Sequence, residues 1–96
     1  MLELREIAKI VDGVAKDTFT SRNFVRPIVE PAVDSVGNEA LHVMIVIKPG
    51  AMDRVSGDAI FDTLTRIHDR LQGQGDERFP IIQYATEKDL KAAVDA

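Results

Sequence analysis

The stretch "FVRPIVEPAVDSVGNEALHVMIVIK", residues 24–48, decides the fold because it holds two strands and the turn between them. Proline has no N–H group for a strand ladder and is normally confined to the edge of a sheet. Pro27 and Pro31 lie four residues apart, so their missing N–H groups face the same side of the strand. We therefore expect the first half to form an edge strand whose outer side is closed to further pairing. The residues left to pair on the inner side are Ile28, Glu30 and Ala32.

The second half of this stretch predicts a turn and a strongly apolar strand. Gly37-Asn38 lies in the turn Ser35 to Asn38, so the strand Ala40 to Lys48 should return antiparallel to the first. Its core "VMIVI" is apolar at both parities, which is typical of a strand covered on both faces. Three short helices are too few to cover both faces, so we expect the second face to meet a partner.

Apolar residues at helical spacing predict a longer helix on either side of this hairpin. The first runs from about Leu2 to Thr18. The second begins near Ser56 to Asp58 and ends near Gln72, with Gly73 or Gly75 as a left-handed cap. Its predicted buried stripe consists of Ile60, Leu64, Ile67 and Leu71, widened by Phe61. On its exposed side, ion pairs are expected among Asp62, Arg66 and Asp69.

A third strand, Phe79 to Ala85, and a short final helix complete the chain. Thr86 is the predicted cap of that helix, with Asp89 at its third position. The order helix, strand, strand, helix, strand, helix predicts an α+β fold with residues 1–96 in a single globular domain. We expect a small three-stranded antiparallel or mixed sheet packed by helices. A crossover through the second helix would make the last two strands parallel.

Composition excludes several classes of function. The chain has no cysteine, which excludes disulfides and thiolate chemistry. Its formal net charge is −4 and it has no basic cluster, so nucleic acid is not an expected partner. No segment approaches the roughly 18 apolar residues of a membrane span, and the N-terminus lacks the apolar centre of a signal peptide. We therefore expect a soluble cytoplasmic protein with no membrane partner; residues 76–90, "DERFPIIQYATEKDL", have the character of small bacterial proteins.

The segment "IVIKPGAMDRVSGDAIFD", residues 45–62, has the outline of a phosphate-binding loop between a strand and a helix. A P-loop ends in Gly-Lys-Ser/Thr, whereas here Lys48 precedes the first glycine and Asp58 follows Gly57. A carboxylate in that place would repel phosphate. The segment therefore predicts a helix start, at which Ser56 and Asp58 satisfy free N–H groups and complement the helix dipole.

No other pattern in the sequence predicts catalytic, cofactor-binding or metal-binding residues. His42 and His68 lack the local spacing of a metal site, and partly buried structural roles are the better interpretation. Asp58, Asp62 and Asp69 lie on an arginine-rich helix surface, which favours a solvated, ion-paired face over paired acid and base groups.

Two hypotheses of function follow. The first is a non-catalytic interaction module or accessory subunit that forms a homodimer or binds another protein. Its candidate contact residues are Val43, Met44, Val46, Ile82 and Tyr84.

The alternative hypothesis is a small-ligand-binding or enzymatic domain. It places a site between the 49–57 loop and the end of the third strand, because long loops after strands often hold ligands. Its polar groups would be Lys48, His42, Arg78 and Tyr84.

Overall fold

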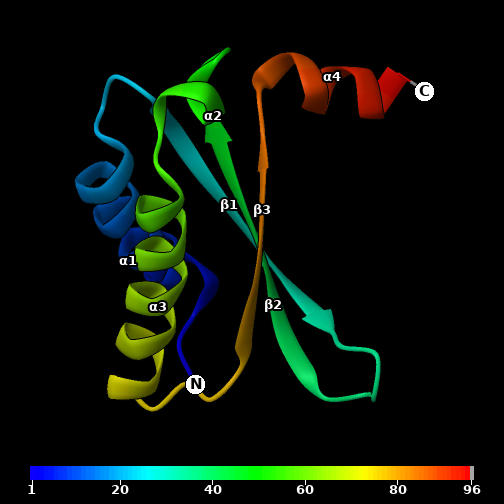
Figure 1. Cartoon of the computed structure of the whole chain (residues 1–96). Helices are drawn as coiled ribbons and strands as arrows, with labels where there is room; N and C mark the ends of the chain where they lie inside the picture. Colours follow the sequence, from blue (N-terminus) through cyan, green and yellow to red (C-terminus); the bar gives the residue numbers. More distant parts are fainter. Residues whose placement is uncertain (96) are drawn as a thin grey trace.

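A three-stranded mixed sheet with the strand order β1-β2-β3 forms the centre of the protein, seen almost edge-on in Figure 1. The structure is a computed structural model and describes residues 1–95. The strands are β1 (Phe24–Val33), β2 (Glu39–Ile47) and β3 (Phe79–Ala85). The helices are α1 (Leu4–Phe19), α2 (Ala51–Arg54), α3 (Gly57–Gly73) and α4 (Glu87–Asp95). The predicted α+β class and element order are confirmed, and α2 is an additional short helix inside the predicted loop.

The pairing of the strands confirms both the hairpin and the edge position of β1. β1 pairs antiparallel with β2, with Ile28 opposite Met44 and Glu30 opposite His42. β3 pairs with the other side of β2 in parallel, so the sheet is of the mixed type. The strand that contains both prolines is thus at one edge of the sheet, and β3 forms the other edge.

A bulge at the start of β1 changes which side chain faces the core. Phe24 is opposite Ile47 and Arg26 is opposite Val46, so Val25 is an extra residue without a partner on β2. One extra residue reverses the alternation of side chains along a strand. Phe24 is consequently buried, whereas Val25 is exposed although it shares its parity with Pro27 and Val29.

The hydrophobic core lies between one face of the sheet and the helices α1 and α3. β2 contributes alternate residues to it, which are Leu41, Val43, Ile45 and Ile47. α1 contributes Ile7, Val11, Val14, Ala15 and Phe19, which lie on one side of the helix. α1 packs against β1, and α3 packs against both α1 and β3. The core is therefore closed on this side by the protein's own helices.

The predicted buried stripe of α3 is wrong in one position. Phe61 is 70% exposed, whereas Thr63 is fully buried against α1. The Thr63 and Thr18 hydroxyl oxygens are 2.6 Å apart, and Thr63 also donates to the Ala59 carbonyl. A threonine with these partners can be buried at little cost, so the buried face of α3 turns toward α1 and away from Phe61.

The ion pairs of α3 also differ in part from the prediction. Arg66 binds Asp17 of α1 at 2.8 Å and Asp62 at 3.6 Å, instead of pairing with Asp69. Asp17 lies within reach because α1 packs against α3. The Asp17 partner joins two helices, which sequence spacing within α3 alone does not predict.

The helix ends follow the predicted chemistry. The Ser56 hydroxyl accepts a hydrogen bond from the Ala59 N–H, which confirms that the 45–62 segment contains a helix start. Thr86 and Asp89 cap α4 reciprocally through side chain and backbone. After α3, Gly75 adopts a left-handed conformation with φ +83°, as proposed for one of the two glycines there.

A buried ion pair fixes the N-terminus to the start of β3. The Asp76 carboxylate is almost fully buried, binds the Arg78 guanidinium at 2.6 Å and accepts a hydrogen bond from the Leu2 N–H. The hydrogen bonds from the Arg78 side chain lower the pKa of Asp76 to about 2. The same guanidinium donates to the Leu2 carbonyl, so Arg78 has a structural role.

Candidate interaction surface

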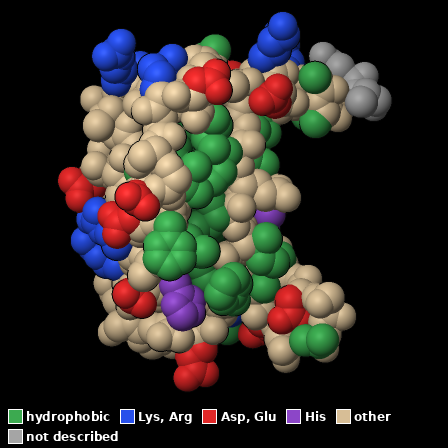
Figure 2. Space-filling view, in the orientation of Figure 1, with side chains coloured by type: hydrophobic (Ala, Val, Ile, Leu, Met, Phe, Trp, Pro, Cys, Tyr) green, Lys and Arg blue, Asp and Glu red, His purple; other side chains and the backbone are tan. Residues whose placement is uncertain are grey.

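The face of the sheet opposite α1 and α3 is not covered by a helix within residues 1–95. We call this the open face, and it presents alternate residues of all three strands, among them Ile28, His42, Met44, Phe79 and Ile81. α4 projects from the end of β3 on this side, and the β1–β2 hairpin curves out at the opposite end (Figure 1). Figure 2 shows that the molecule is hollowed between these two projections.

An ion pair crosses the open face near the end of β2. Val46 lies in register between Arg26 of β1 and Ala85 of β3, and it is fully buried. Arg26 binds Glu87 at the start of α4 through two hydrogen bonds, so this pair joins the two edge strands across β2. The Arg26 guanidinium lowers the pKa of Glu87, and Glu87 in turn raises the pKa of Arg26.

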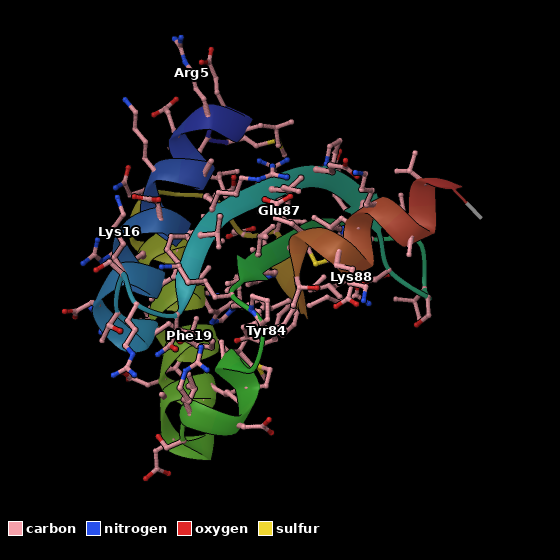
Figure 3. All side chains as sticks on the ribbon, turned by 90° about the horizontal axis from the view of Figure 1, so that it is seen from above. Arg5, Lys16, Phe19, Tyr84, Glu87 and Lys88 are labelled. Carbon is pink, nitrogen blue, oxygen red and sulfur yellow. The ribbon has the colours of Figure 1, made fainter. Side chains whose placement is uncertain are left out.

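The five contact residues expected from the sequence are divided between the two faces. Val43 is opposite Ile82, and both lie on the face toward the helices together with Tyr84. Val43 is completely buried, and the Tyr84 ring stacks on Phe19 (Figure 3). Met44 and Val46 are on the open face, and only Met44 of these two reaches the surface there. The structure therefore does not bring the five residues together into one surface.

A different group of apolar side chains is exposed along β3 and the adjoining side of α3. Phe61 is 70% exposed, Phe79 is 53% exposed and Ile81 is 37% exposed. His68 of α3 packs against Phe79 with ring centroids 5.5 Å apart, which connects the helix to the strand. We call Phe61, His68, Phe79 and Ile81 the apolar band. Figure 2 shows hydrophobic side chains along this side of the molecule, with acidic and basic groups mainly outside them.

Sequence patterns did not reveal this band. The sequence predicts Phe61 as part of the buried stripe, and it predicts Phe79 and Ile81 only as residues of the third strand. The available signal was the composition of β3, because Phe79–Ala85 contains no charged residue although it follows the charged segment "DER". An uncharged strand at a sheet edge is unusual, since native proteins commonly place charges there.

The polar groups proposed for a ligand site do not converge. Arg78 lies beside Glu39 at the start of β2, whereas Lys48 follows the other end of that strand. His42 is on the open face and bonds to the Gln83 side chain at 2.8 Å, while Tyr84 is on the opposite face. Parallel pairing of β2 with β3 separates the first residues of β3 from the 49–57 loop, so this set of four residues is a wrong grouping.

Arg54 in the 49–57 loop is bound within the fold and does not point to a ligand site. Arg54 of α2 donates to the Asn23 side chain and to the Pro49 carbonyl. Gly50 has φ +77°, and a side chain there would lie 3.0 Å from the Arg54 guanidinium. Within the part of the chain that the structure describes, no three His, Asp or Glu side chains form a group that could hold a metal ion.

Comparison of the chain with family models, curated proteins and solved structures finds no match. Among the described residues, no helix combines the length and apolar character needed to cross a membrane. The geometry of the fold therefore provides the basis for a functional proposal.

Proposed function

We propose that this protein is a non-catalytic interaction module that binds another protein molecule through the apolar band and the adjoining open face. The observation that supports this most strongly is the exposure of Phe61, Phe79 and Ile81 beside an uncharged strand. A contiguous apolar surface of this kind on a small domain is typical of a protein interaction site. Aromatic side chains are also the residues most often enriched at such interfaces.

The polar groups near this surface support binding over catalysis. His42 is hydrogen-bonded to Gln83, and His68 packs on the Phe79 ring. The buried carboxylate nearest to β3, Asp76, is fully engaged by Arg78 and by the Leu2 N–H. General acid and base catalysis needs a group with an accessible proton and a tuned pKa. These groups are used to hold the fold together.

The experiment that tests the proposal is sedimentation velocity of the purified chain from micromolar to millimolar concentration. We expect the average mass to rise with concentration, or a stable complex with a partner protein that requires the apolar band. The variant Phe79→Lys with Ile81→Lys should abolish either form of association. Val33→Lys with Val36→Lys is the matched control, because both valines are highly exposed on the hairpin, away from the band.

Two results would overturn the proposal. One is a chain that sediments as a monomer at every concentration and also in a lysate of the cells that produce it. The other is association that the control substitutions weaken as much as the substitutions in the band do.

A further inference from the structure

The two edge strands of the sheet, β1 and β3, differ in sequence. β1 carries Pro27 and Pro31, which remove N–H groups from its outer side. No strand within residues 1–95 pairs with the outer side of β3, which faces the viewer in Figure 1. Edge strands usually carry charges, prolines or bulges because a bare edge pairs with other chains. β1 thus loses alternate outward N–H groups to its two prolines, whereas β3 has one proline, Pro80, at its start and none over residues 81–85.

The composition of β3 permits it to pair with a second copy of itself. Like charges that face each other across two strands are destabilising. In a two-fold antiparallel pair a residue faces its own copy only at the axis, and every other residue faces the one at the mirrored position. The seven residues "FPIIQYA" carry no charge, so two copies of β3 can pair without repulsion. β1 could not do so as well, because Pro27 and Pro31 remove two hydrogen-bond donors from such a pair.

The alternation of side chains restricts the register of such a pair. Residues that are directly opposite must lie on the same face of the sheet. The open face of one copy then continues into the open face of the second copy. A two-fold axis through Ile82 at the centre of β3 satisfies this condition and pairs the strand over its full length. Phe79 is then opposite Ala85 of the second copy, and Ile81 is opposite Gln83. The large aromatic side chain of Phe79 thereby meets the smallest residue of the strand, Ala85.

The proline in β3 is compatible with this arrangement. Because the inner side of β3 pairs with β2, the Pro80 nitrogen is expected on the free side, where it removes one donor from each copy. The backbone N–H groups of Ile82 and Tyr84 then face that side too, because the direction alternates along a strand. The two copies of Ile82 can exchange a pair of hydrogen bonds, and Tyr84 can donate to the Pro80 carbonyl of the second copy.

The exposed side of α3 lies where the second copy would cover it. α3 packs beneath β3, whereas α1 packs beneath β1, so α3 is the helix nearer to the free edge. In an α-helix with 100° between residues, Phe61 and His68 lie on the side away from Thr63, which faces α1. The contact between His68 and Phe79 shows that this side of α3 adjoins β3. Joining two copies at β3 brings their α3 helices together and covers Phe61.

We propose that the partner of this surface is a second copy of the same chain. The two copies pair their β3 strands antiparallel about a two-fold axis at Ile82, and the two sheets become one six-stranded sheet. This inference rests on the proposed function, since it names the molecule that the apolar band binds. The two α3 helices form the contact beneath the joint.

A cysteine cross-link tests the register directly, because the natural chain contains no cysteine. Residues facing each other as a hydrogen-bonded antiparallel pair have Cα atoms about 5.5 Å apart, which a disulfide can span. We expect Ile82→Cys to yield a covalent dimer under mild oxidation. Val33→Cys on the opposite edge is the control, and should remain monomeric although Val33 is 68% exposed.

A second variant tests strand pairing independently of any effect of Ile82→Cys on folding. Ile81→Lys places two positive charges diagonally across the proposed axis, and we expect it to weaken dimerisation roughly tenfold or more. A sedimenting dimer that neither cross-links at residue 82 nor weakens with Ile81→Lys would overturn strand pairing but leave the proposed function intact. A heteromeric complex without self-association would do the same. A strict monomer with no partner would overturn both.

Discussion

The rings of Phe19 in α1 and Tyr84 in β3 are stacked, with centroids 5.3 Å apart and an angle of 11° between their planes (Figure 3). This contact joins the end of the first helix to an edge strand that begins sixty residues later. Offset aromatic pairs stabilise a fold beyond the area that they bury. The stack therefore holds β3 in place on the side that faces away from the open face.

Removal of the Tyr84 ring should destabilise the protein. We expect Tyr84→Ala to lower the free energy of unfolding by about 3 kcal/mol, through loss of the stack and of apolar burial. Tyr84→Phe keeps the stack and should change it by less than about 1 kcal/mol. Urea denaturation followed by circular dichroism measures both values. Equal losses in the two variants would show that the hydroxyl, and not the ring, carries the stabilisation.

Tyr84 should also make stability depend on alkaline pH. Burial raises the pKa of Tyr84 to about 12 from an ordinary value of 10. The folded state therefore favours the neutral phenol, and this contribution is complete below pH 10 and is lost as the pH rises toward 12. We expect stability to fall over this interval in the natural chain and to fall less in Tyr84→Phe. Parallel pH curves for the two proteins would contradict this account.

Asp76 should have the opposite dependence, at acid pH. The Arg78 side chain lowers the pKa of Asp76 from 3.8 to about 2, so the folded state favours the carboxylate. Its contribution is present above pH 4 and is lost as the pH falls toward 2. Asp76→Asn should cost about 3 kcal/mol at neutral pH, because it leaves Arg78 without its charged partner.

Thermal denaturation between pH 2 and pH 7 measures this effect. Glu77→Gln is the control, because Glu77 is the exposed neighbour of Asp76 and should leave the curve unchanged. An Asp76→Asn protein as stable as the natural chain at pH 7 would show that the ion pair is dispensable.

Two glycine substitutions should have opposite effects on stability. Gly50→Ala forces a side chain into a left-handed conformation beside Arg54, and should cost about 1–2 kcal/mol. Gly13 lies within α1, and an added methyl group there meets no atom within 4 Å. Gly13→Ala should therefore stabilise the protein by about 0.5–1 kcal/mol. Chemical denaturation of both variants measures the difference, and effects of the same sign would contradict the assigned conformations.

Local signals in the sequence predicted most of the fold. Pro27 and Pro31 indicated the edge strand, and Ser56 and Thr86 indicated two helix starts, because each effect depends on neighbouring backbone groups. The bulge at Val25 and the four-residue helix α2 were not predictable in this way. Both depend on how the chain fits between elements that are distant in the sequence.

The surface was harder to predict than the fold for a similar reason. The sequence indicated that β2 is apolar on both sides, but not which side the helices would cover, so Val43 and Met44 were assigned to one contact surface. Burial of Thr63 depends on Thr18 in another helix, and it determines that Phe61 is exposed. These pairings between helices decide what remains at the surface.

Amide hydrogen exchange at low and high protein concentration tests the central claim most directly. If the free edge of β3 is the contact surface and a second copy occupies it, the N–H groups of Ile82 and Tyr84 should exchange more slowly at high concentration. Those of the proline-protected outer side of β1 should exchange at the same rate at both concentrations. Exchange at Ile82 and Tyr84 that does not depend on concentration, under conditions where the chain sediments as a dimer, would contradict the account.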